Sequence, residues 1–169
     1  MRRKTASRDV KQVKNFIKKE LKALVEADRR LHIAKLNRNK ITEYTLQAII
    51  WDHLSQFVEG SWMLSIEDFV PTFKNKKADI VLCKLTRDGR PDLHSGTIAI
   101  EVKPNGQQKG LFGDLKKLSQ YIGRQRSPIN LGVLMYLSPL DLYEKDLRKR
   151  AKSLCGRKIE VIRLDPRGS

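Results

Sequence analysis

The sequence predicts one α/β domain in which a mixed β-sheet is flanked by helices. Two patterns support this prediction: amphipathic helical periodicity fills the chain up to Gly60, and short β-type runs begin at Trp62. The first three runs follow one another directly, whereas the last two alternate with helical patterns. Strands joined by turns pair antiparallel and strands joined by helices pair parallel, so the sheet should contain both arrangements.

The 169 residues include 40% hydrophobic residues, with no internal repeat and no low-complexity linker. This composition is sufficient for one core of ordinary size, and nothing in it indicates two folding units. We therefore expect a single domain over residues 1–169. It would consist of a basic N-terminal helical extension at 1–40, the core at 41–137, and a C-terminal helix and strand at 138–165.

Two helices are expected before the sheet. The first covers residues 9 to about 34, where apolar residues recur every three or four positions and lysines occupy the opposite face. The apolar stripe consists of Val10, Val13, Phe16, Ile17, Leu21, Leu24, Val25 and Leu31. The second helix has Thr42 as its N-cap and ends at Gly60. Glu43 lies in its first turn on the stripe that faces the core, where it either complements the helix dipole or has a functional role.

Three strands are expected next, followed by alternating helices and strands. The three strands cover residues 62–70, 78–85 and 97–103, with turn residues such as Asp88-Gly89 between the second and the third. The remaining elements are a helix from Asp114 to about Gln125, a strand at 131–137, a helix that Ser138-Pro139 begins and Gly156 ends, and a last strand with the sequence IEVIRL. The glycine-rich segment 104–113 is expected to be a mobile loop over a substrate.

Three residues on neighbouring strands are candidates for a reactive site. In the third strand, alternation places Glu101 and Lys103 on one face, and in the second strand it gives Asp79 a defined face. If these faces coincide, two carboxylates and an amine converge. Carboxylate oxygens suit Mg²⁺ or Mn²⁺, which need few protein ligands when water and phosphate supply the others. Such an ion would activate a water, and Lys103 would orient or deprotonate that water and stabilise the phosphate.

An acid two residues before a lysine is a common pattern in so charged a chain. It occurs at Asp9/Lys11, Glu20/Lys22, Glu101/Lys103 and Asp114/Lys116. Three of these pairs fall on expected helices, where residues two apart point in different directions. Only Glu101/Lys103 lies on an apolar strand that follows another strand bearing an aspartate. The alternative interpretation is an edge strand whose Glu and Lys face solvent.

The segment KADIVL, a turn and the segment TIAIEVK together resemble the core of the PD-(D/E)XK nuclease superfamily, which has the restriction-endonuclease-like fold. The resemblance covers about residues 41–137, and it implies Mg²⁺-dependent hydrolysis of phosphodiester bonds, usually in DNA. The residues that would carry this chemistry are, by resemblance, Asp79 and Glu101 as metal ligands, the backbone carbonyl of Val102 as a further ligand, Lys103 as the catalytic lysine and Glu43 as the acid of the upstream helix.

Other residues compete for two of these roles. Ala78 stands where the family name has a proline, a difference that many members share, whereas a literal proline-aspartate occurs at Pro91-Asp92. We favour Asp79 over Asp92, because Asp92 lies in a turn-rich loop with no strand between it and the third strand. The helix acid is also open, with Glu43, Glu59 and Glu67 as candidates.

Basic residues after the third strand are candidate nucleic-acid contacts. In some branches of this superfamily, the helix after the lysine strand presents a glutamine or a basic residue four residues before a tyrosine, a spacing that Lys117 and Tyr121 share. An ordinary amphipathic helix with a surface lysine explains Lys117 equally well. Further candidates are Lys109, Arg124 and Arg126.

The chain has 35 Lys and Arg against 19 Asp and Glu, a formal charge of +16. Such an excess favours a polyanionic partner. We therefore expect a metal-dependent endo- or exodeoxyribonuclease, with a structure-specific enzyme of the resolvase or nicking type as one form of it. The alternatives are a catalytically inactive DNA-binding or assembly module on the same fold, and an RNA-directed nuclease. Resolvase-like and nicking enzymes act as dimers, so a second copy of the chain is an expected partner.

The distribution of charge leads to one further expectation. The lysines from Lys11 to Lys22, Lys117 and the cluster from Arg148 to Lys152 should surround the acidic site and steer phosphate toward it. No window reaches the roughly 18 apolar residues of a membrane span, so no membrane partner is expected. Cys83 and Cys155 lack the spacing of a zinc site, which indicates a reduced, cytoplasmic protein.

Overall fold

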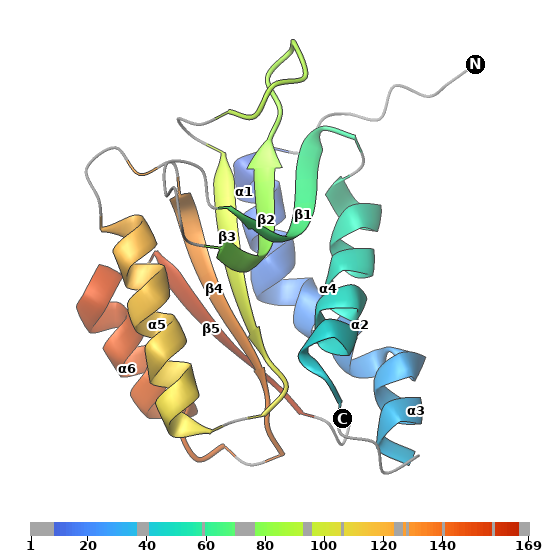
Figure 1. Ribbon diagram of the computed structural model, residues 1–169, viewed down its shortest axis with the longest axis vertical. Helices are drawn as coiled ribbons and strands as arrows, with labels where there is room; N and C mark the ends of the chain where they lie inside the picture. Colours follow the sequence, from blue (N-terminus) through green and yellow to red (C-terminus); the bar gives the residue numbers. More distant parts are fainter. Residues whose placement is uncertain are drawn as a thin grey trace.

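The computed structural model describes residues 9–36, 41–58, 60–69, 77–92, 96–105, 107–123, 127, 129–139, 141–156 and 158–165. Helices and strands follow one another in the expected order (Figure 1). They are α1 (Val10–Phe16), the π-helical turn η1 (Ile17–Leu21), α2 (Lys22–Ala27), α3 (Arg29–Leu36), α4 (Glu43–Val58), β1 (Trp62–Phe69), β2 (Lys77–Lys84), β3 (Thr97–Lys103), α5 (Gln108–Ile122), β4 (Ile129–Leu137), α6 (Glu144–Cys155) and β5 (Ile159–Leu164).

The strands form one five-stranded sheet with the order β1-β2-β3-β4-β5. β2 pairs antiparallel with β1 and with β3, whereas β4 pairs parallel with β3 and with β5. The prediction of an α/β fold with a mixed sheet is therefore confirmed. The register places Glu101, Leu134 and Val161 in one row across β3, β4 and β5, so these residues mark one level of the sheet.

Helices cover both faces of the sheet (Figure 1). One layer contains α1, η1, α2 and α4, and the other contains α5 and α6. In β3, Ile98, Ile100 and Val102 are buried in the core beneath the first layer, whereas Ala99 is buried in the core beneath α5 and α6. Successive side chains of a strand point to opposite faces. Glu101 therefore lies on the Ala99 face, toward α5 and α6.

The N-terminal helical segment is interrupted where the periodicity predicted one helix. It begins at Asp9, which forms a capping box with Gln12. It breaks at Asp28, whose backbone is extended and whose Oδ1 accepts a hydrogen bond from the Arg30 N–H at 2.9 Å. Asp28 thus acts as the N-cap of α3, because a short carboxylate competes well for free helix amides. Leu24 was expected on the buried stripe but is 40% exposed, since η1 adds a residue to the turn before it and rotates the following positions.

The helices next to the sheet differ from the expected boundaries in two places. Thr42 caps α4 as predicted, its Oγ1 accepting a hydrogen bond from the Thr45 N–H at 3.1 Å. α5 begins at Gln108 rather than at Asp114, with Leu111 buried in its first turn. The prediction of a mobile loop over 104–113 is therefore wrong for residues 108–113, because the buried Leu111 anchors a helical turn despite the neighbouring glycines.

α6 begins at Glu144, several residues after the predicted start. The Ser138 N–H donates to the Leu164 carbonyl at 3.0 Å, so Ser138 extends the contact of β4 with β5 and does not cap a helix. The end of α6 is as predicted, since Gly156 takes a φ of +63°, a conformation that favours glycine. In the part of the chain that the structure describes, no helix is both long and apolar enough to cross a membrane.

Candidate functional site

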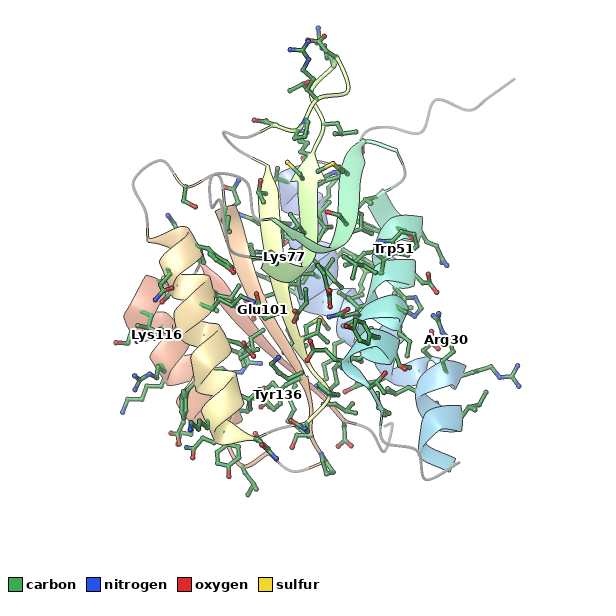
Figure 2. The ribbon with its side chains drawn as sticks, in the orientation of Figure 1. Arg30, Trp51, Lys77, Glu101, Lys116 and Tyr136 are labelled. Atoms are coloured by element: carbon green, nitrogen blue, oxygen red, sulfur yellow. The ribbon has the colours of Figure 1, made fainter. Side chains whose placement is uncertain are left out.

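The site lies where β2 and β3 separate, since both strands continue beyond the last residues that pair. The β2–β3 pairing ends at Ile80 and Ile100, one step before Asp79 and Glu101. The Asp79 side chain then replaces a strand partner: its Oδ2 accepts a hydrogen bond from the Val102 N–H at 2.6 Å. Asp79 and Glu101 thus lie side by side on adjacent strands, as the alternation of the strands predicted. Figure 2 shows Glu101 on the side of β3 that faces α5.

Glu101 is the most deeply buried carboxylate of the site. It is 1% exposed, and its Oε2 accepts a hydrogen bond from Lys117 Nζ at 2.8 Å. Its other oxygen, Oε1, is buried and has no hydrogen-bond partner among the described residues. Burial and the nearby Asp79 carboxylate raise the pKa of Glu101 to about 8, although Lys117 acts in the opposite direction. A buried acid with one unpaired oxygen is a place where a cation would be stabilised.

Lys103 joins helices from the two layers at the end of β3. Its Nζ lies 3.1 Å from Glu43 Oε2 on α4 and 3.6 Å from Asp114 Oδ2 on α5. Burial alone lowers the pKa of Lys103, but the carboxylates of Asp114, Glu43 and Asp79 together raise it above its usual value. Lys103 is therefore an ammonium group at neutral pH. It is suited to stabilise negative charge and unsuited to remove a proton from water.

Asp114 on α5 is a further acid of the site, and no sequence pattern assigned it there. It is largely buried, its Oδ2 has no hydrogen-bond partner in the described part of the chain, and burial raises its pKa despite the neighbouring lysines. Burial likewise raises the pKa of Asp79, with a further contribution from Glu43. The sequence feature that could have identified Asp114 is its spacing from Lys117, because residues three apart lie on one face of a helix.

Tyr121 attaches α5 to the start of β2. It lies one turn after Lys117, and its hydroxyl donates a hydrogen bond to the Lys77 carbonyl at 3.0 Å, two residues before Asp79. Burial raises the pKa of Tyr121 well above its usual value, and the carboxylates of Glu101 and Asp79 add to this shift. The hydroxyl therefore stays protonated and holds α5, with Lys117, against the strand that carries Asp79.

The structure separates Asp92 from this cluster, whereas the register of β1 with β2 leaves Glu67 level with Asp79. The Asp92 carbonyl accepts a hydrogen bond from Cys83 Sγ at 3.8 Å, which places Asp92 at the end of β2 opposite Asp79. Glu67 is exposed on β1 with a φ of 50°. Glu59 lies outside the described residues, whereas Glu43 contacts Lys103. Glu43 is thus the helix acid that reaches the site.

The candidate nucleic-acid contacts differ in position. Lys117 lies inside the site, paired with Glu101. Lys109 is exposed in the first turn of α5. Arg124 and Arg126 lie outside the described residues.

The carboxylates can be tested against the chemistry of a hard divalent ion. The described residues contain no group of three or more His, Cys, Asp or Glu side chains arranged to hold a metal ion. Two of the acids, Glu43 and Asp114, are directed toward Lys103. Mg²⁺ commonly uses only one or two protein carboxylates and takes its other oxygens from water and phosphate. Asp79 and Glu101, with the unpaired Glu101 Oε1, fit such a donor set.

No protein-family model matches the chain, and no curated protein or solved structure is significantly similar to it. The interpretation of the site therefore depends on its own residues and contacts.

Proposed function

We propose that the protein is a metal-dependent nuclease that hydrolyses phosphodiester bonds in DNA, built on a restriction-endonuclease-like core. The observation that carries the proposal is Glu101, a fully buried carboxylate with an unpaired oxygen beside a second carboxylate, Asp79. Two buried acids at one point repel each other and raise their own pKa, so the arrangement is costly unless a cation neutralises it. The succession of α4, β1 to β3, α5 and β4 supports the fold assignment.

The residues have separate roles in this proposal. Asp79 and Glu101 would hold Mg²⁺ or Mn²⁺, with the Val102 backbone carbonyl as a further ligand. The ion supplies Lewis acidity, which lowers the pKa of a bound water and offsets negative charge. In the hydrolysis, the oxygen of water would form a bond to phosphorus and lose one proton to solvent, while the bond from phosphorus to the leaving oxygen breaks and that oxygen takes one proton from solvent.

The lysines act on the phosphate. Lys103 is an ammonium held between Glu43 and Asp114, so its charge is fixed in position at the end of β3. It would stabilise the charge that increases on the phosphate oxygens during reaction. Lys117 brings a second positive charge to Glu101 from α5 and would bind a phosphate oxygen. The formal charge of +16 supports a polyanionic substrate.

Cleavage assays test this function directly. The substrates would be supercoiled, linear, single-stranded and branched DNA together with a single-stranded RNA, each with Mg²⁺, Mn²⁺ or EDTA. We expect metal-dependent cleavage of DNA that is lost in Asp79→Ala and Glu101→Ala. The matched control is Glu20→Ala, which removes an exposed carboxylate on η1 and should retain activity.

Three outcomes would contradict the proposal. If the intact protein cuts no nucleic acid with either metal but binds DNA, it is a binding module. If it cuts RNA alone, the substrate assignment is wrong. If both site variants cut as fast as the parent protein, the chemistry lies elsewhere in the chain.

A further inference from the structure

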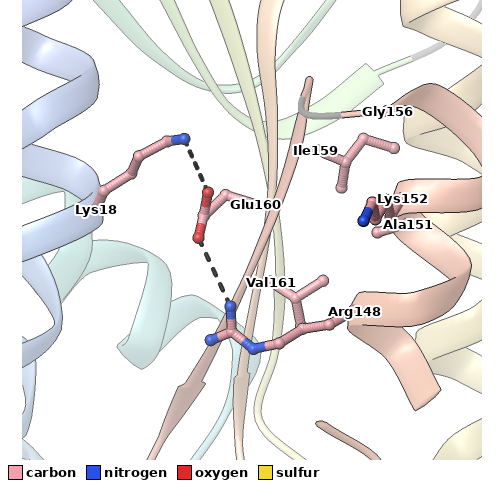
Figure 3. Close-up of a pocket in the computed structure, with 8 residues that line it drawn as sticks. All are labelled: Lys18, Arg148, Ala151, Lys152, Gly156, Ile159, Glu160 and Val161. Atoms are coloured by element: carbon pink, nitrogen blue, oxygen red, sulfur yellow. Dashed lines mark ion pairs between the residues drawn. The ribbon is translucent and has the colours of Figure 1, made fainter. Parts of the chain in front are cut away.

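A second polar feature lies at the far edge of the sheet, beside β5. It is a pocket of about 320 Å³ (Figure 3). The residues that line it are Lys18, Arg148, Ala151, Lys152, Gly156, Ile159, Glu160 and Val161. Three cationic side chains against one carboxylate leave the lining with a formal excess of two positive charges.

Both helical layers contribute to this pocket. Lys18 extends from η1 on one side, and Arg148 and Lys152 extend from α6 on the other (Figure 3). Between them lies β5, which is the last strand in the sheet order and therefore has one edge without a paired strand among the described residues. The cations thus come from two separate elements and the acid from a third, so their arrangement depends on the fold.

The single carboxylate of the pocket is shared between two cations. Glu160 Oε2 lies 3.0 Å from Lys18 Nζ, and its Oε1 lies 3.7 Å from an Arg148 guanidinium nitrogen. Lys152 has no ion pair with any residue that the structure describes. Lys14 and Lys158 add to the positive field: after burial, repulsion from Lys18 and Lys158 is what lowers the pKa of Lys14. The pocket therefore has more positive charge than its own acid neutralises.

This pocket is separate from the carboxylate–lysine site. Val161 lies level with Glu101, two strands away. At about 4.8 Å between strands, this separation is roughly 10 Å, and the pocket opens on the outer side of β5, whereas Asp79 lies on the β2 side of β3. The lysines and arginines of the expected cationic surround are therefore divided between the site and this pocket. Lys117 lies in the site, but Lys18, Arg148 and Lys152 line a different pocket.

We propose that this pocket binds a phosphate group of a nucleic-acid backbone, at a second position separate from the carboxylate–lysine site. The inference rests on the proposed function, because the ligand is the nucleic acid that the protein would cleave. Flexible ammonium groups and a guanidinium around a small, open cavity fit a phosphate oxygen cluster. Phosphate contacts of this kind position a nucleic acid without reading its sequence. A backbone held at both places would extend from the middle of the sheet at β3 to its edge at β5.

A pair of matched variants tests the proposal. The pocket variant combines Lys18→Gln with Lys152→Gln. The control variant combines Lys19→Gln with Lys145→Gln, which removes the same charge from exposed positions of the same two elements outside the pocket. Binding of a fluorescent DNA duplex is measured by anisotropy in EDTA over a series of salt concentrations, so the readout needs no cleavage.

We expect the pocket variant to bind DNA on the order of tenfold more weakly than the control variant. The slope of log K against log salt should fall by about one for each lysine removed, because each phosphate contact releases a condensed counterion. If the two variants bind equally, only net charge matters, and the cations merely shield the edge of β5 from other strands. That result would overturn the proposal.

A second arm separates a DNA backbone from free phosphate. Inorganic phosphate and a short DNA duplex are titrated separately into ¹⁵N-labelled protein, and the amide signals of Gly156, Ile159 and Val161 are followed. Shifts with DNA at micromolar concentration, and with phosphate only at far higher concentration, support the proposal. Shifts with micromolar phosphate and none with DNA would overturn it. Because neither arm requires turnover, loss of the second site and loss of nuclease activity are distinguished.

Discussion

The carboxylate–lysine site and the β5 pocket combine the same side-chain types with opposite excess charge. The site contains four carboxylates and two lysines, namely Glu43, Asp79, Glu101, Asp114, Lys103 and Lys117. The pocket contains one carboxylate and three cations, namely Glu160, Lys18, Arg148 and Lys152. A protein with a charge of +16 thus has a locally acidic centre. Net charge indicates a class of partner, whereas local excess and burial decide what each region can bind.

Burial is the larger difference between the two regions. The Glu101 side chain is 1% exposed and the Glu160 side chain is 23% exposed. Water screens a charge at the surface but not one in the interior, so the acids of the buried site perturb each other while Glu160 is stabilised by its lysine and arginine. Removing a charge should therefore change activity or stability strongly at the site, and should change DNA binding and stability only slightly at the pocket.

The largest effect is expected from Lys103→Met at the carboxylate–lysine site. This variant keeps the length of the side chain but removes the ammonium between Glu43 and Asp114. We expect the cleavage rate with Mg²⁺ to fall on the order of 10³-fold, because a fixed charge that stabilises the transition state contributes about this much. DNA affinity in EDTA should change by less than about threefold, since one phosphate contact among many is removed. Cleavage rates and anisotropy measure the two quantities.

The matched control for this prediction is Lys116→Met, an exposed lysine on α5 (Figure 2). It should cleave at the parental rate. If Lys103→Met lowers DNA affinity and leaves the cleavage rate intact, Lys103 is a binding residue and the contrast between a reactive site and a binding pocket fails.

Much of the site could be predicted from the sequence because strands have a strict period. Alternation alone placed Glu101 and Lys103 on one face, and the antiparallel meander brought Asp79 beside them. Asp114 was missed because the predicted start of α5 lay at that residue. With the helix beginning at Gln108, Asp114 lies within it and one turn before Lys117. Helix boundaries depend on buried anchors such as Leu111, which local patterns specify weakly.

The β5 pocket could not be predicted from any local pattern. Lys18 and Arg148 are 130 residues apart and come from different layers. They meet only because β5 pairs beyond β4 and becomes the edge of the sheet. A pattern of charges along one helix predicts which face of that helix is exposed. The pairing order of the strands decides which helices of the two layers come together at the edge of the sheet.

The second prediction concerns stability and pH at Glu101. The pKa of this carboxyl is raised from 4.5 to about 8 in the folded protein, so the folded state holds the proton more strongly than the unfolded state. The full stability is present below pH 4.5, decreases as pH rises toward 8, and is constant above that pH. We expect Glu101→Gln, which cannot ionise, to be more stable than the parent by roughly 4 kcal/mol at pH 8.

Urea unfolding from pH 4.5 to 9 measures this difference. The matched change at the other region is Glu160→Gln, which should leave the pH dependence of the parent in place. If the stability of Glu101→Gln falls as steeply with rising pH as that of the parent, Glu101 does not carry the buried charge.

The third prediction concerns Asp114, the acid that positions Lys103. Asp114→Asn keeps the shape of the side chain but removes one of the two carboxylates near Lys103 Nζ. We expect the maximal cleavage rate to fall about tenfold with no change in KM, because a less well fixed ammonium stabilises the transition state less. Stability should not decrease, since burial of an ionised Asp114 is unfavourable and its pKa is raised. A rate unchanged from the parent would mean that Glu43 alone holds Lys103.

The smallest effect is expected from Glu160→Gln, measured by DNA binding. At the buried site, loss of Asp79 or Glu101 is expected to abolish cleavage, whereas at the pocket loss of the Glu160 carboxylate releases Lys18 and Arg148 from their shared partner. We expect DNA to bind about two- to threefold more tightly in EDTA, and stability to change by less than about 1 kcal/mol, because partly exposed ion pairs contribute little. Weaker binding would mean that Glu160 orients the cations for phosphate. In that case the two regions would work in the same way, because in each of them a carboxylate would position a lysine that contacts the DNA backbone.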